Sequence, residues 1–441
     1  MGRTYRLLTA AAVITSLGNS GAVVAAAFAV LHGGGDGTDV GLVAAARTVP
    51  LIAFLLVGGA VADRLPRHRV MVAANCLNCA SQAAFAALVL TGAPPVWQLA
   101  LLAALGGTGQ AFFAPAAEGM LLSCVPAAHA GRAFAFFRIG VNGAGIGGAA
   151  LGGALCAAAG PGWVLAGDAA AFALAAALRA ALDTGAIPPR KRRSRLGHDL
   201  REGWREVAGR RWLWVVVAQF AVVNAAFAAT QSVYGPLVAR DRLGGAGAWG
   251  AALAAFGAGT LLGALVMTRW KPRRMLLTGG WGSLMCALSP AALAAGLPLP
   301  VLAATMAGCG IGVEVFAVTW MTALHQEIPA DKLSRVSSYD WLGSVGMVPV
   351  ATALAGPVQE MTGRPAALWG SAALIALLTL AALSVPDVRR LTRGTADAPQ
   401  ERDAPRGCQT PQERPATAAS PAEGTFPVQG SRAAPRATCS S

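Results

Sequence analysis

A few polar side chains interrupt long apolar stretches of this chain, and they are the residues best able to do chemistry. Glu314 stands near the middle of one stretch, and amides take similar central positions in others: Asn19, Gln110, Asn142 and Asn224. If these stretches are membrane helices, each such residue marks a candidate site, because polar groups there are costly. Low-dielectric surroundings disfavour an ionised carboxylate, so we expect Glu314 to exchange a proton near neutral pH. The alternative is a structural carboxylate hydrogen-bonded to a neighbouring helix.

Four other charged residues lie nearer the ends of their apolar stretches. Arg47 and Asp168 have similar depths toward one end, and Glu118 and Arg138 lie toward the other. Pairing within each set removes two unpaired charges at once. We therefore expect two structural ion pairs, Arg47 with Asp168 and Glu118 with Arg138.

A short basic loop, GGAVADRLPRHR at 58–69, separates two apolar stretches. Its carboxylate, Asp63, can accept hydrogen bonds from the N-terminus of a helix, while Arg64 and Arg67 can bridge helix ends or lipid phosphates. Asp340, near the end of a later apolar stretch, is a plausible partner for this loop. Charge that merely fixes topology is the alternative explanation.

Composition places the chain among multi-pass membrane proteins. It has 441 residues, of which 55% are hydrophobic and 13% charged, whereas soluble domains have roughly 25% charged residues. The net charge of +14 does not indicate nucleic-acid binding, because the basic residues stand in gaps between apolar segments rather than on one polar face. The cysteine pair Cys76 and Cys79 has no second pair or nearby His, so we expect no metal site.

Twelve stretches are long enough to span a bilayer, which takes about 20 apolar residues. We expect an all-α membrane protein with spans at 7–31, 40–62, 70–91, 97–121, 132–158, 163–184, 212–237, 248–268, 275–296, 300–324, 335–358 and 365–385. Alternate gaps carry most of the Arg and Lys. By the positive-inside rule these gaps are cytoplasmic, and with an even number of spans we expect both termini to be cytoplasmic as well.

The chain also repeats itself with a period of about 205 residues. Asn19 corresponds to Asn224, and the loop DRLPRHRVM at 63–71 corresponds to TRWKPRRML at 268–276. A duplicated six-helix unit predicts two related halves. The predicted organisation is a first bundle at 1–187, a basic linker at 188–211, a second bundle at 212–388, and a disordered cytoplasmic tail at 389–441.

The loop pattern Gly59-x-x-x-Asp63-Arg64-x-x-Arg67-x-Arg69 resembles the signature between the second and third helices of the major facilitator superfamily of secondary transporters. This resemblance implies the major facilitator fold, and it implies that these five residues act in a cytoplasmic gate. The run GVNGAGIGGAALGG at 140–153 is similar to the glycine-rich fifth-helix motif of antiporters. SLGNS at 16–20, AFFAPA at 111–116 and SRVSSYDWLGS at 334–344 look like the bacterial multidrug or siderophore exporter branch.

These observations together predict a transporter rather than an enzyme. We expect proton-coupled export of a small amphipathic compound, such as an antibiotic, siderophore or other metabolite, by alternating access. The proton gradient would supply the energy without any cofactor, since no GxxxxGK[ST] loop for ATP is present. The expected partners are the small-molecule substrate and the lipid bilayer, with no nucleic acid and a monomer in the plasma or inner membrane. An importer, an uncoupled facilitator and a membrane-embedded transferase remain as alternatives.

Overall fold

The computed structural model describes residues 3–123, 130–182 and 208–393, and almost all of them are helical. Twelve helical segments in this part of the chain are long and apolar enough to cross a membrane, which confirms the predicted all-α class. The first six spans are single helices: α1 (Arg3–His32), α2 (Gly37–Arg64), α3 (Arg67–Thr91), α4 (Val96–Ser123), α5 (Ala130–Ala159) and α6 (Pro161–Ala180).

Several of the six later spans are interrupted. The seventh consists of α8 (Arg211–Ala229), η2 (Thr230–Tyr234), α9 (Gly235–Val238) and η3 (Ala239–Leu243); α10 (Ala246–Arg269) is the eighth; α11 (Met275–Leu284), η4 (Met285–Ala287) and α12 (Leu288–Ala294) form the ninth; α13 (Leu299–Glu327) is the tenth; α14 (Ala330–Gly346) and α15 (Val348–Thr362) form the eleventh; α16 (Arg364–Ser384) is the twelfth, followed by the short α17 (Pro386–Arg390).

Proline explains the breaks. Pro66 caps the start of α3 and leaves only two residues between α2 and α3, because a proline and the residue before it disfavour a continuous helix. Pro349 stands at the start of α15, where it cannot donate a hydrogen bond to the preceding turn, and the eleventh span breaks at Met347. Pro236 follows η2, a π-helical turn in the seventh span.

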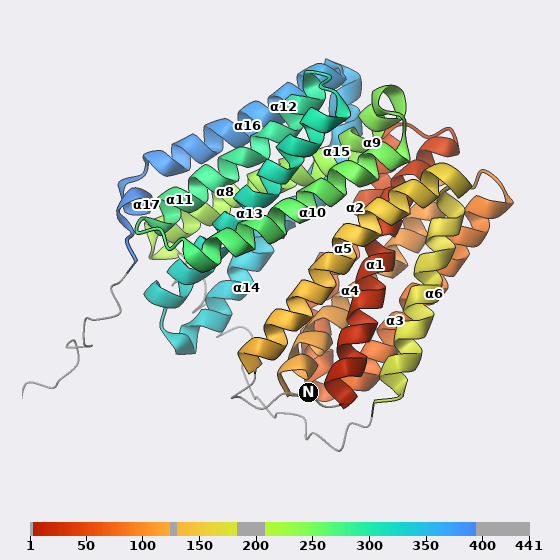
Figure 1. The fold of residues 1–441 in the computed structure, drawn as a ribbon, viewed down its shortest axis with the longest axis horizontal. Helices are drawn as coiled ribbons and strands as arrows, with labels where there is room; N and C mark the ends of the chain where they lie inside the picture. The colour runs from red at the N-terminus through yellow and green to blue at the C-terminus, as the bar shows by residue number, and fades with distance from the viewer. Residues whose placement is uncertain (1–2, 124–129, 183–207, 394–441) are drawn as a thin grey trace, which may run out of the picture. The chain divides into compact units, whose positions relative to one another are not determined.

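Helix packing repeats between the halves. In the first half α2 packs on α4, α3 on α4 and α6, and α1 on α5 and α6. In the second half α10 packs on α13, α11 on α13 and α16, and α8 on α14, α15 and α16. These are the same pairs once each span is shifted by six, as the sequence repeat predicted. Figure 1 shows the red-to-yellow helices gathered in one bundle and the green-to-blue helices in another.

The two halves meet chiefly along α5 with α10 and along α2 with α15. A Cβ placed on Gly153 of α5 would lie 2.8 Å from the Cα of Gly250 in α10, so the backbones touch there. Gly41 of α2 similarly leaves no room between itself and the carbonyl of Thr352 in α15. Both contacts lie where α2 and α10 begin, and small residues are what allow such close approach.

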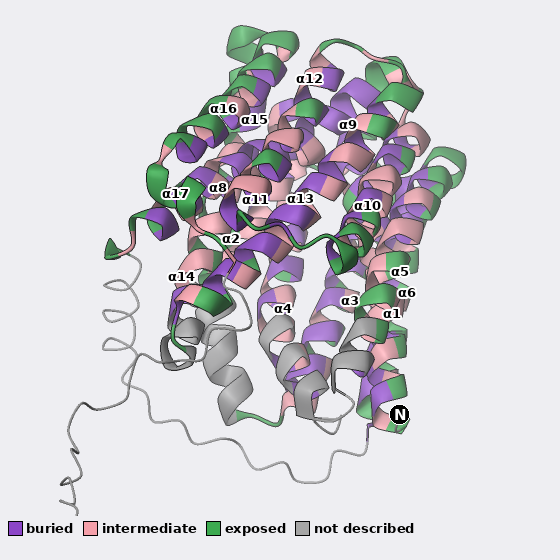
Figure 2. Ribbon diagram, turned by 60° about the vertical axis from the view of Figure 1, so that its left-hand side comes forward, coloured by how far each residue is buried: buried purple, intermediate pink, exposed green. Residues whose placement is uncertain are grey.

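The side of the molecule where these two glycine contacts lie is called the opposite face, because it is opposite the basic face defined next. The other side, which we call the basic face, carries the α2–α3 link and the α10–α11 link with Arg269, Lys271 and Arg273. Along the helices, buried and exposed residues alternate, so that each helix turns part of its surface inward (Figure 2). Most of the predicted linker at 188–211 and of the tail at 389–441 lies outside the described residues, and the predicted domain limits stay predictions.

Candidate functional site

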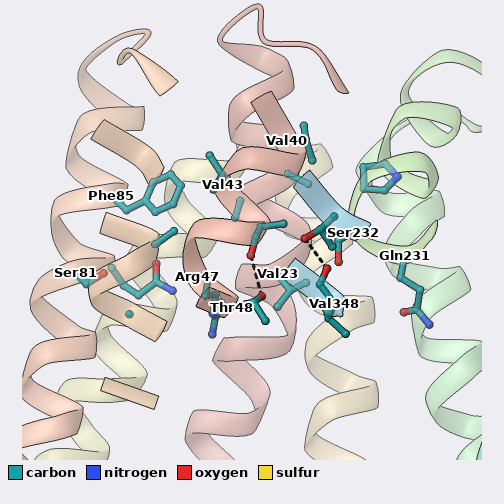
Figure 3. A pocket seen from close by; sticks show the side chains of 18 of the residues that line it. Val23, Val40, Val43, Arg47, Thr48, Ser81, Phe85, Gln231, Ser232 and Val348 are labelled. Carbon is teal, nitrogen blue, oxygen red and sulfur yellow. Dashed lines mark hydrogen bonds between the residues drawn. The ribbon is translucent and has the colours of Figure 1, made fainter. Parts of the chain in front are cut away.

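A cavity of about 210 Å³ lies between the two halves toward the opposite face. We call it the Arg47 cavity. The first half contributes Arg47 and Thr48 of α2 with Ser81 and Gln82 of α3, and the second half contributes residues of η2, α9, α10 and α15. In the view of Figure 3, Arg47 and Thr48 lie between Ser81 on one side and Gln231 on the other. The cavity wall is therefore mixed: apolar over most of its area, with a cation and several neutral hydrogen-bonding groups.

The Arg47 guanidinium does not pair with Asp168 as the sequence led us to expect. Its Nη2 donates instead to Oδ1 of Asn19 in α1, at 2.5 Å. Asp168 of α6 is 1% exposed, and neither of its carboxylate oxygens has a hydrogen-bond partner among the described residues. The two charges still interact electrostatically. The structure thus gathers Asn19, Arg47 and Asp168 into one cluster, with the cation held by the neutral amide.

Two polar residues of this cavity, Gln231 and Ser232, were missed by the sequence reasoning. Both lie in η2, the π-helical turn that precedes α9. Pro236 lacks the N–H that would bond to the carbonyl of Ser232, so the regular hydrogen-bond ladder cannot continue there. Such turns change the direction of the side chains and occur often at functional sites. A polar pair one turn ahead of a proline in an apolar stretch was the available signal.

A second cavity, of about 450 Å³, brings Glu314 and Arg138 together, and we call it the Glu314 cavity. Glu314 stands midway along α13 in the second half, and Arg138 comes from α5 in the first. They share this cavity with Met321, Thr322 and His325, farther toward the basic face on α13. Arg138 is close enough to Glu314 to interact with its charge. A proton gained or lost here would therefore be felt by both halves.

The other predicted polar residues are placed separately. Asn224 of α8 donates through Nδ2 to the carbonyl of Ser344 in α14 at 2.8 Å. Asp340 of α14 accepts a hydrogen bond from Nε1 of Trp320 in α13 at 2.9 Å, so its described partner is not the gate loop. Gln110 and Asn142 are half-buried and line neither of the two cavities. Of the predicted cavity residues, only Asn19, through Arg47, and Glu314 are thus associated with the two cavities.

The gate loop is described only in part. Gly59, Asp63 and Arg64 belong to the last turns of α2, but their side chains lie outside the described residues. Arg67 and Arg69 stand in the first turn of α3, where Arg69 donates its backbone N–H to the carbonyl of Pro66. The side chain of Glu118 also lies outside the described residues, so its predicted pairing with Arg138 stays a prediction.

Arg179 of α6 is a further buried cation that the sequence reasoning missed. It is 1% exposed, and its guanidinium lies 4.6 Å from the ring centre of Phe113 in α4. Stacking on an aromatic face stabilises a cation away from water. Because α6 ends directly after Arg179, we interpret this contact as part of the packing at the basic end of the first half.

Two six-helix halves that enclose polar cavities at membrane depth define a membrane transporter. The chain matches the Major Facilitator Superfamily over residues 8–348 and belongs to that family. It is 29% identical over 411 residues to the multidrug efflux pump Tap of Mycolicibacterium fortuitum, in an alignment that covers 87% of this chain and 96% of that protein. Family membership sets aside the alternative of a membrane-embedded transferase.

Solved structures agree on the fold. The nucleoside transporter NupG superposes with a TM-score of 0.71 at 12% identity, over 87% of this chain and 99% of that one. A bacterial homologue of the iron transporter ferroportin, in an inward-facing state, superposes with a TM-score of 0.67 at 14% identity, again over 87% and 99%. At these identities the likeness extends to the fold and not to the cargo.

Proposed function

We propose that this transporter exports a small amphipathic compound, such as an antibiotic, a siderophore or another metabolite, in exchange for protons. The observation that carries the proposal is the Glu314 cavity, where one carboxylate from the second half faces one arginine from the first. A titratable carboxylate of one half that interacts with a charge of the other half lets protonation favour one arrangement of the halves over the other. The multidrug efflux pump to which the chain is similar supports the choice of export.

Charge attraction explains how a proton would act on the two halves. Ionised Glu314 attracts Arg138, and the attraction between opposite charges grows as the distance between them falls and as water is excluded. Protonated Glu314 exerts no such pull. We therefore infer that loss of the proton draws α5 and α13 together toward the basic face, and that its return lets them separate.

This order of events gives antiport. When the transporter is open at the opposite face, Glu314 takes a proton from the solution on that side, and the cargo leaves to the same solution. With Glu314 neutral, the halves part at the basic face, where the proton is released and new cargo enters. Ionised Glu314 then favours closure of the basic face. The proposal places the basic face and both termini in the cytoplasm, in the plasma or inner membrane, with a monomer as the working unit and the proton gradient as the source of energy.

Everted membrane vesicles test this proposal, with ethidium or another fluorescent amphipathic cation that the expressing cells are shown to expel. We expect accumulation of the dye that collapses with a protonophore, and loss of gradient-driven accumulation in Glu314→Gln. Glu327→Gln is the matched control, because Glu327 ends the same helix outside the cavity. Dye entry that only equilibrates with the medium, and that neither the protonophore nor Glu314→Gln changes, would instead support an uncoupled facilitator, whereas gradient-driven loss of preloaded dye from the vesicles would support an importer.

A further inference from the structure

Asp168 is the most isolated carboxylate in the described part of the chain. It is 1% exposed within α6, and neither oxygen has a hydrogen-bond partner among the described residues. Gly18 of α1 packs directly on it, since a Cβ there would lie 2.5 Å from Oδ1. Gln82 of α3 approaches the carboxylate without a hydrogen bond of normal geometry. An ionised carboxylate left in this state would be strongly destabilising, so either a proton or a cation must neutralise it.

Arg47 is the cation within reach. It interacts with the charge of Asp168, yet its Nη2 donates to Asn19. Cys79 of α3 is the other titratable group that faces Asp168 from the packed helices, and a thiol is mostly neutral at pH 7. Along α6 itself the next charged residue is Arg179, three turns away. Among the described residues, the charge state of Asp168 is therefore set by a proton and by Arg47.

We propose that Asp168 is a second proton-binding residue, and that Arg47 moves between Asn19 and Asp168 as this proton is lost and gained. With the carboxylic acid protonated, Arg47 bonds to Asn19, which is the arrangement in the structure. When the acid releases its proton to water in the Arg47 cavity, a carboxylate remains, and the guanidinium turns to pair with it. Arg47 keeps its own charge throughout, so one proton leaves and no other bond forms or breaks.

The switch reaches the cavity between the halves. Arg47 lines that cavity opposite Gln231, Ser232 and Thr352 of the second half, whereas Asp168 stands behind its wall. Turning Arg47 toward Asp168 withdraws a positive charge from the shared wall. Proton binding at Asp168 thus changes the charge on the cavity wall that faces the second half, and it does so independently of Glu314.

Infrared spectroscopy of the purified full chain in nanodiscs tests the proposal, because a protonated carboxylic acid has its own C=O stretching band. The probe is pH alone, so no cargo is needed. We expect a band component that bleaches as the pH rises, is absent in Asp168→Asn and persists in Glu314→Gln. Glu314→Gln distinguishes this proposal from the proposed function. Gradient-driven export can be lost while the Asp168 band still titrates, and the Asp168 band can be missing while gradient-driven export continues.

Two further variants show whether Arg47 is the switch. Asn19→Ala removes the amide that holds Arg47, so the guanidinium pairs with Asp168 and proton affinity falls by about tenfold or more. Arg47→Gln removes the counter-charge, so proton affinity rises. A purely structural acid would not respond to Asn19. The proposal is overturned if the whole band survives in Asp168→Asn, or if Asn19→Ala and Arg47→Gln fail to move the titration in opposite directions. The latter comparison stands even if Asp168→Asn does not fold.

Discussion

Arg138 of α5 and Glu314 of α13 line one cavity, although they belong to different halves of the transporter. Sequence spacing paired Arg138 with Glu118 of its own half, and the structure adds a partner across the boundary. A charge pair inside one half can only stabilise that half. A pair across the boundary responds to the motion between the halves, and this is why the proposal of proton coupling centres on it.

Arg138→Gln should slow gradient-driven export several-fold without unfolding the protein. Removing the arginine leaves ionised Glu314 with no attraction to the first half, so closure of the basic face loses its driving force. Initial rates of dye uptake into everted vesicles, at matched expression, measure the effect. Arg269→Gln, at the exposed end of α10, provides the control. Equal rates in the two variants would show that Arg138 has no part in closure.

The gate motif is expected to be asymmetric. Its first copy contains Asp63, whereas Thr268 stands at the corresponding place in the second copy. We expect Asp63→Asn to impair switching between states and to reduce transport about tenfold or more, while Thr268→Ala has little effect because it removes no carboxylate. Transport assays at matched expression provide the measurement. Similar losses in the two variants would contradict an asymmetric gate.

The Gly153–Gly250 contact should be sensitive to added volume. Gly153→Val forces α5 away from α10, where no space for a Cβ exists, and such overpacking typically costs about 1–3 kcal/mol. We expect a lower thermal unfolding temperature and slower transport. Gly143→Val is a matched control on the same helix, because a Cβ at Gly143 meets nothing within 4 Å. Equal unfolding temperatures for the two variants would argue against backbone contact at the opposite face.

The hydrogen bond from Trp320 to Asp340 should stabilise the folded protein. Trp320→Phe keeps an aromatic ring stacked on Phe316 and edge-to-face with Trp212, but removes the N–H that donates to Asp340. Asp340 is half-buried and keeps its contact with Ser344, so the loss of one hydrogen bond should cost about 0.5–1.5 kcal/mol and lower the unfolding temperature. In the Trp320→Phe background, Asp340→Leu should cost less than it does alone, because the hydrogen bond between the two side chains is already lost. A double variant that is destabilised by the full sum of the two single changes would exclude coupling between them.

Most of the fold could be predicted from the sequence, since a spanning helix needs only length and apolar composition. All twelve predicted spans are present, and the recurring residues correctly indicated two halves that pack alike. Helix interruptions were harder. The π-helical turn before Pro236 and the break at Met347 depend on how the backbone rearranges where a proline removes a hydrogen bond. A hydropathy pattern does not contain this information.

The sequence predicted how deep each candidate residue lies along its helix, but not which neighbouring helix its side chain faces. Counting along the spans placed Arg47 near Asp168 and Glu314 near the centre of α13, and both placements agree with the structure. Rotation of each helix decides which neighbour a side chain meets, and rotation is fixed by packing. This is why Asn19 rather than Asp168 holds Arg47, and why Arg138 lies beside Glu314.

Proton movement coupled to dye movement is the most direct measure of the central claim. Proteoliposomes loaded with the expelled dye and a pH indicator, with no imposed pH gradient and the potential clamped by potassium and valinomycin, report both fluxes at once. Antiport predicts that dye efflux carries protons inward, so the internal pH falls, and that Glu314→Gln abolishes this fall. An internal pH that rises would indicate symport, and a constant pH would indicate a facilitator; either result would contradict proton-coupled export.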